Sequence, residues 1–136
     1  MSDIKHARMM LDITDSDRKA IRNMLDADKF DDTIFGFHAQ QAVEKLFKAW
    51  LSLRGVAYPR THDLKVLYQL LEDQQEGGLE TFADLIDLTD FAVQFRYESA
   101  TDLEPIDRPD TVRAIDRLFA YIENLVQYAE QGGTSC

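Results

Sequence analysis

The stretch that decides the fold is FHAQQAVEKLFKAWLSLRG, residues 37–55. Its apolar residues recur at steps of three and four, which is the period of an amphipathic α-helix and differs from the alternation of a β-strand. Asp31, a residue type that favours helix starts, precedes the stretch. Gly55 follows it, and glycine readily takes the left-handed conformation that ends helices. The sequence therefore predicts one long helix from about Asp31 to Leu53.

The segments on both sides of this helix show the same period. They predict a helix over residues 3–28, a short helix from an N-cap at Thr61 to about Asp73, a helix from Phe82 to near Arg96, and a last helix from Pro109 to about residue 130. Four long helices with short connections and one small helix are typical of an antiparallel bundle. We expect an all-α fold, an antiparallel four-helix bundle with one additional short helix. Residues 1–131 form a single domain in this prediction, and residues 132–136 a disordered tail.

Composition narrows the class of protein. No run of apolar residues is long enough for a membrane span, and the single cysteine, Cys136, cannot form a disulfide within the chain. We therefore expect a cytoplasmic protein that does not enter a membrane. The net charge of -10 argues against a broad nucleic-acid footprint. Residues 45–65 nevertheless carry five basic residues against one acidic residue, whereas residues 72–90 carry seven acidic residues and no base. An anionic ligand should be drawn to the first segment and repelled by the second.

The long central helix also carries a polar track. At 100° per residue, His38, Gln41, Lys45, Lys48 and Ser52 share an arc of about 80°, opposite the apolar side. Donors and cations in such a track can follow phosphate oxygens. An ordinary solvated helix face has the same pattern, so spacing leaves both interpretations open.

Two residues outside this helix are further candidates. Arg96 ends the apolar stripe of the fourth helix, where it is either a dipole-favoured cation or a forked donor for a phosphate. His62 lies next to the expected cap at Thr61, so it is either a local capping partner or a ligand contact. We expect no metal site and no cofactor, because the three histidines lie on three separate segments without paired ligand spacing.

The residues from Phe37 to Ala49, with Arg54-Gly55, residues 59–64 and Arg96-Tyr97 downstream, resemble the signature of the prokaryotic HEPN family. The resemblance runs from about Ala7 to the last helix. It implies a helical bundle, commonly a homodimer, often encoded beside a small nucleotidyltransferase and sometimes acting as the toxin of a toxin-antitoxin pair. It also implies one polar groove formed by His38, Gln41, Lys45, Lys48, His62, Arg96 and Tyr97.

In ribonuclease members of that family, four to six residues stand between an arginine and the histidine that follows it. After Arg96 the positions for that histidine hold Thr101, Asp102 and Leu103, and no other arginine precedes a histidine at that spacing. An ionised aspartate is a poor general acid near neutral pH, so Asp102 is a weak substitute. We therefore favour a non-catalytic module that binds a nucleotide or another phosphate ligand and works with a nucleotidyltransferase. An atypical ribonuclease toxin and a purely structural dimerising subunit are the alternatives.

The last predicted helix has a second apolar line beside its core stripe. Its members are Ala114, Leu118, Tyr121, Leu125 and Tyr128. One interpretation is a surface for a symmetric dimer, the commonest soluble oligomer, and the other is a final helix that is simply well buried.

Overall fold

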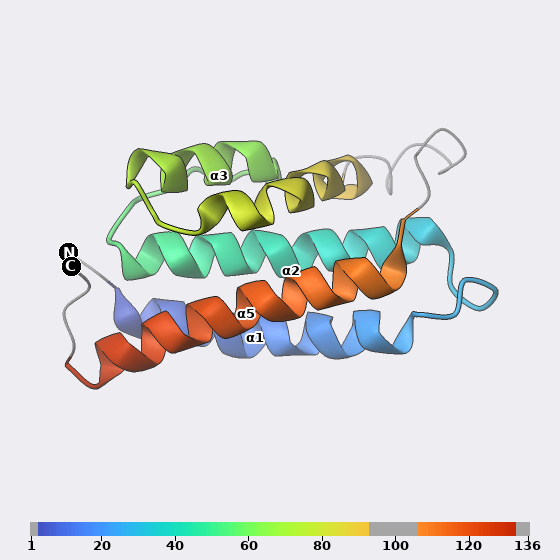
Figure 1. The fold of residues 1–136 in the computed structure, drawn as a ribbon, viewed down its shortest axis with the longest axis horizontal. Helices are drawn as coiled ribbons and strands as arrows, with labels where there is room; N and C mark the ends of the chain where they lie inside the picture. The colour runs from blue at the N-terminus through green and yellow to red at the C-terminus, as the bar shows by residue number, and fades with distance from the viewer. Residues whose placement is uncertain (1–2, 93–105, 133–136) are drawn as a thin grey trace.

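The computed structural model describes residues 3–92 and 106–132, and every regular element within these ranges is helical. The all-α prediction is therefore confirmed. The elements are α1 (Ile4–Asn23), α2 (Asp32–Leu53), α3 (Leu64–Asp73), the 3-10 helix η1 (Leu79–Leu88) and α5 (Arg108–Glu130). Helix α1 and η1 run in one direction, and α2 and α5 run in the other (Figure 1). These four elements form an up-down-up-down bundle, and α3 is the additional short helix.

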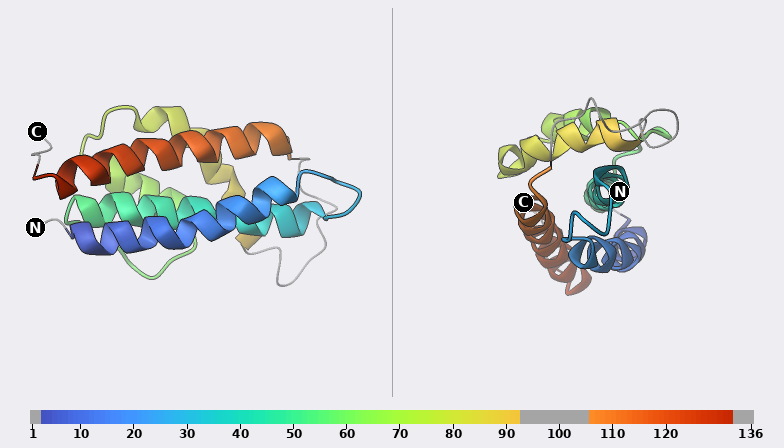
Figure 2. Two further views of the ribbon diagram at one scale, coloured as in Figure 1. Left: turned by 90° about the horizontal axis from the view of Figure 1, so that it is seen from below. Right: turned by 90° about the vertical axis from the view of Figure 1, so that its right-hand side faces the viewer.

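Helix α2 lies at the centre of this arrangement and packs against α1, α3, η1 and α5 (Figure 2). It is buried on almost every side, including at polar Gln40, Glu44 and Ser52. The apolar side of α2 faces the core as predicted, since Phe47 and Trp50 are fully buried. The interpretation of the other side as a solvated face is wrong, because α1 and the chain before α3 cover it. No helix in the described part of the chain is long and apolar enough to cross a membrane.

Helix α1 ends at Asn23, five residues earlier than the apolar spacing predicts. The turn that follows is contacted by a residue at the start of α5. Arg108, which is buried, donates from Nη1 to the Met24 carbonyl and from Nη2 to the Phe30 carbonyl, both at 2.6 Å. Its Nη2 also donates to Asp32 Oδ1 at 2.7 Å. The guanidinium thereby fixes the turn between α1 and α2, because it supplies donors to carbonyls that the helix no longer pairs.

The first residues of the helices differ in detail from those that the sequence predicts. Asp31 does precede α2, but its side chain makes no capping hydrogen bond. Thr61 is not the cap of α3. That position is Asp63, which accepts from the Lys65 amide, while the Thr61 hydroxyl accepts from the Asp63 amide. Pro109 is the second residue of α5 and not the first, because Asp107 is the cap.

The element after α3 also begins earlier than predicted and in another form. Gly78, with φ of 80°, allows the turn into η1, and residues 89–92 continue as α-helix. Phe91 packs directly on the backbone of α2 at Gly36, where an added Cβ would lie 2.2 Å from the aromatic ring. The absence of a side chain at Gly36 thus permits the close approach of these two helices.

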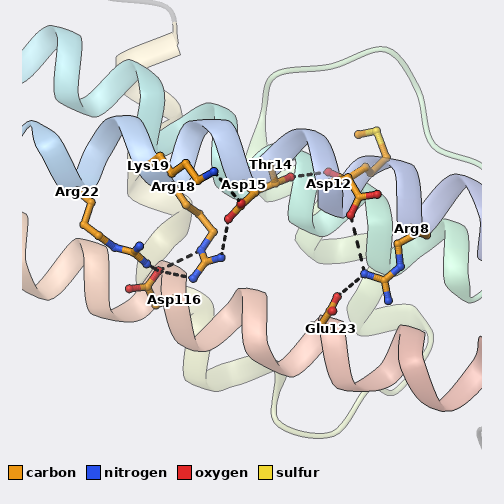
Figure 3. A network of polar contacts seen from close by, with 10 residues as sticks. Arg8, Asp12, Thr14, Asp15, Arg18, Lys19, Arg22, Asp116 and Glu123 are labelled. Carbon is orange, nitrogen blue, oxygen red and sulfur yellow. Dashed lines mark hydrogen bonds and ion pairs between the residues drawn. The ribbon is translucent and has the colours of Figure 1, made fainter.

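The polar middle of α1, which weakens its apolar pattern, faces α5 across a row of ion pairs (Figure 3). Arg18 and Arg22 both bind Asp116 Oδ1, at 3.1 and 3.2 Å. Arg8 bridges Glu123 at 2.7 Å and Glu130 at 2.9 Å. The hydrogen bond from Arg8 holds the pKa of the Glu130 carboxyl below its ordinary value. The charged residues of α1 therefore form ion pairs with α5, and they do not interrupt the helix.

Most of the second apolar line on α5 is occupied within the chain. Leu118 is fully buried, and Tyr121 packs against Trp50, with its hydroxyl donating to the Gly77 carbonyl at 2.8 Å. Leu125 is partly buried against the core, whereas Tyr128 is 52% exposed. A buried final helix therefore accounts for this line without a second subunit, and a dimer stays a prediction.

Candidate functional site

The polar track of α2 is lined on one side by α1 and on the other by the chain that leads into α3. Of the predicted residues, His38, Gln41, Lys45 and Lys48 lie on the track and are partly buried. Each contacts another side chain of the protein, so the track is not an open row of unpaired donors.

Asp17 of α1 is the partner on the first side. Lys45 Nζ donates to Asp17 Oδ2 at 2.7 Å. His38 Nδ1 lies 3.5 Å from Asp17 Oδ1, a contact too poorly aligned to be a hydrogen bond, and this buried nitrogen has no other partner among the described residues. One carboxylate is thus shared by a lysine and a histidine; we call Asp17, His38 and Lys45 the Asp17 triplet.

Glu44 of α2 is the partner on the second side. Its Oε2 accepts from Lys48 Nζ at 2.9 Å, and its Oε1 lies 2.8 Å from His62 Nδ1. Gln40 Nε2 donates to Glu44 Oε1 at 3.1 Å and to the His62 carbonyl at 2.9 Å. Gln41 then donates to Gln40 Oε1 at 2.9 Å. Glu44, Lys48 and His62, which we call the Glu44 triplet, repeat the pattern of one carboxylate held by a lysine and a histidine.

Glu44 is ionised in this setting although it is 5% exposed. Burial raises the pKa of its carboxyl, because a desolvated carboxylate is unfavourable. The hydrogen bonds from Lys48, His62 and Gln40 outweigh burial and leave the pKa of Glu44 below its ordinary value. The carboxylate is therefore a fixed negative charge inside the protein, and it holds the side chains of Lys48 and His62 in place.

The side chain of His62 is the most exposed member of the Glu44 triplet, at 57%. The residue precedes α3 and does not lie in its first turn as predicted, because the helix begins after Asp63. With Nδ1 directed to Glu44, the other face of the ring is open to solvent. His62 is thus the group through which this buried network reaches the surface.

The network extends from Lys48 toward the start of α1. Lys48 Nζ lies 5.6 Å from the centre of the Tyr58 ring, and the Tyr58 hydroxyl lies 3.3 Å from His6 Nε2. A cation over an aromatic face is attracted by the ring quadrupole, so Tyr58 also helps to fix the lysine.

Comparison with known proteins agrees with this architecture. A family model described as HEPN domain matches residues 7–131, nearly the whole chain. The chain belongs to the HEPN family. Neither the curated proteins nor the solved structures give a match to it.

The HEPN site predicted from sequence is thus assembled in part. His38, Gln41, Lys45, Lys48 and His62 come together around α2. Arg96 and Tyr97, as well as Asp102, lie outside the described residues, so their convergence with the track stays a prediction. No group of three metal-ligating side chains occurs in residues 3–92 and 106–132.

Sequence reasoning missed the two carboxylates that organise the HEPN track. Glu44 stands four residues from both Gln40 and Lys48, and this spacing places all three on one side of a helix, so it is a usable signal. Asp17 gives no such signal, because its partner Lys45 is 28 residues away and only the packing of α1 on α2 joins them.

Most of the positive charge of residues 45–65 is paired with carboxylates in the structure. Lys45 and Lys48 are neutralised by Asp17 and Glu44, and Arg54 pairs with Glu76. Arg60 and Lys65 are exposed, and neither has an ion-pair partner within the described ranges. Within residues 45–65, the cations available to an outside anion are therefore the two that flank His62 in sequence, Arg60 and Lys65, which we call the rim.

A hollow of about 620 Å³ lies elsewhere, between η1 and the start of α5. Five aspartates line it, with Arg117 as the one basic residue. They are Asp84, Asp87, Asp90, Asp107 and Asp110. A surface of this charge repels phosphate, as the composition of residues 72–90 indicates.

Proposed function

We propose that this HEPN domain is a non-catalytic binding module that takes up a nucleotide, or another phosphate-bearing ligand, at the α2 track and its rim. The observation that carries the proposal is the fixed placement of Lys48 and His62 by the buried Glu44 carboxylate, next to the free cations Arg60 and Lys65. Each lysine ammonium has three N–H donors and uses one on its carboxylate, so donors remain for a ligand. Preorganised donors bind with a smaller loss of side-chain entropy.

We further propose that the module acts with a small nucleotidyltransferase subunit, as a homodimer and in a toxin-antitoxin type of pair. This step is supported only by membership of the family. Isolation of the domain together with its co-expressed neighbour, and the mass of the resulting complex, tests it. A nucleotidyltransferase that never co-purifies, under conditions where both proteins are folded, contradicts it.

The experiment for ligand binding is calorimetry with AMP. We expect weak, salt-sensitive binding, because the acidic remainder of the chain opposes anions. Arg60→Gln and Lys65→Gln should each weaken binding roughly two- to fivefold, the value of an exposed charge contact. Arg117→Gln, at the acidic hollow, removes the same charge and should leave binding unchanged.

Lys45→Gln and Lys48→Gln are less specific tests of ligand binding, because each also breaks an ion pair inside the protein. Their effect on AMP binding is meaningful only beside their melting temperatures.

The alternative function is a structural subunit, and one observation favours it: every described track residue already has a partner in the chain. If the wild type binds no AMP at millimolar concentration, alone or with its partner, the track serves packing and this second function replaces the first.

A further inference from the structure

The two triplets share a feature that the proposed function does not use. In each, one well-buried carboxylate faces a lysine and a histidine together: Asp17 between Lys45 and His38, and Glu44 between Lys48 and His62. His6, the remaining histidine, contacts a tyrosine hydroxyl and no carboxylate. The arrangement therefore distinguishes the two track histidines from the third.

The charge of each triplet depends on its histidine. With a neutral imidazole, the lysine and the carboxylate cancel and the triplet carries no net charge. With an imidazolium, the triplet carries one positive charge. Each carboxylate accepts a hydrogen bond from an ammonium group, and the pKa of Glu44 lies below its ordinary value. The track thus changes from neutral to a charge of two when both histidines are protonated.

Charges of both signs surround each histidine. His62 Nδ1 contacts Glu44 of α2, which also binds Lys48, and Arg60, Asp63 and Lys65 are its charged neighbours along the chain. The described charged groups at His38 are Asp17 from α1 and Lys45 from α2. The local cations oppose protonation and the carboxylates favour it, so a bound anion shifts the balance toward the imidazolium.

The geometry accepts both protonation states. His62 keeps its Nδ1 contact with Glu44 in either state, and a proton added at Nε2 gives a donor on the exposed part of the ring. His38 Nδ1 is buried without a hydrogen bond and 3.5 Å from a carboxylate, so protonation converts an unsatisfied polar atom into half of an ion pair.

We infer that the phosphate site of this HEPN domain is proton-gated: the ligand binds the form in which His62 and His38 are imidazolium, and protons are taken up on binding. The inference rests on the proposed function and adds its regulation. His38 and Lys48 are ten residues apart, about 15 Å along the helix axis, but Lys45 and Lys48 lie within one turn, so the two triplets adjoin along α2.

The test is calorimetry with the deoxy trinucleotide d(ApApA), in two buffers of different protonation enthalpy and at pH values from 6 to 8. Its phosphodiesters stay singly ionised over this range, and without a 2′-hydroxyl it cannot be cleaved by that route. We expect proton uptake on binding and a rise in affinity of at least about tenfold from pH 8 to pH 6, since each linked proton changes affinity by up to tenfold per pH unit. His62→Gln and His38→Gln should each reduce the uptake, and His6→Gln should not.

The NMR signals of the histidine rings in the wild-type protein provide a second measurement if a variant fails to fold. Saturating d(ApApA) should raise the titration midpoints of His62 and His38 and leave that of His6 unchanged. Binding without proton uptake and with pH-independent affinity overturns the gate and leaves the proposed function standing. Absence of d(ApApA) binding at every pH also overturns the gate, and the AMP titration decides the proposed function separately.

Discussion

Replacing Glu44 by glutamine removes the charge at the centre of the Glu44 triplet while keeping the shape of the side chain. The glutamine has one acceptor oxygen where the carboxylate has two, which together accept from Lys48, His62 and Gln40. Removing one partner of a fully buried ion pair costs about 3–5 kcal/mol, and a hydrogen bond to a charged group contributes about 1.5–3 kcal/mol. Because Lys48 is 15% exposed and can turn to solvent, we expect Glu44→Gln to lower the free energy of unfolding by about 2–4 kcal/mol.

The pH dependence has a definite sign. The pKa of Glu44 is lowered in the folded state from its ordinary value of 4.5, so its contribution is fully present above that pH. It is lost as the pH falls through the lower folded value. The stability difference between wild type and Glu44→Gln should therefore be constant near pH 7 and shrink below about pH 4.5.

Urea unfolding followed by circular dichroism at pH 7, 5 and 3.5 measures this difference. Glu72→Gln is the matched control, because Glu72 is exposed and its side chain makes no hydrogen bond among the described residues; it should change stability by less than about 0.5 kcal/mol. A Glu44→Gln protein within 0.5 kcal/mol of the wild type at pH 7, or one whose deficit persists unchanged at pH 3.5, would refute the view of Glu44 as a fixed internal charge.

Three further changes test the fold around the site. Arg108→Met removes the donors to two loop carbonyls and should lower the free energy of unfolding by about 3 kcal/mol in urea titrations, more than the exposed control Arg113→Met; equal effects would contradict the clamp. Gly36→Ala should cost about 1–3 kcal/mol in melting experiments, since its Cβ meets the ring of Phe91, and Phe91→Ala in the same chain should relieve part of the cost; strict additivity of the two changes would exclude the contact. Arg8→Gln should cost less than about 1 kcal/mol, and less still in 1 M salt, because its ion pairs to α5 are partly solvated; a salt-independent loss would indicate packing instead.

The fold was predictable wherever local pattern determines it. Helix α2 ends at Leu53, as its apolar period and Gly55 predict, because both signals lie within the helix and its flank. The end of α1 was not predicted, although Asp26 accepts from the Asp28 amide in the turn that follows; the contact of Arg108 with the Met24 carbonyl, 84 residues away, has no local signal. The 3-10 form of η1 likewise has no signal in residue spacing of three and four, which both helix types share.

The placement of the candidate residues on α2 was predictable, whereas their electrostatics was not. A helical projection correctly brings His38, Lys45 and Lys48 to one side of α2, because 100° per residue is a fixed property of the helix. It cannot show that a carboxylate on α1 neutralises Lys45, because that pairing depends on how two helices pack. For the same reason the basic segment overstated the positive charge that a ligand would meet.

The most direct test of the central claim, that phosphate ligands bind at the α2 track and its rim, is an amide chemical-shift map of the protein during titration with AMP. The account predicts saturable shifts in residues 38–48 and 60–65 and unchanged signals at the acidic hollow, residues 84–91 and 107–117. Shifts confined to the hollow, or no shifts at millimolar AMP, would contradict it.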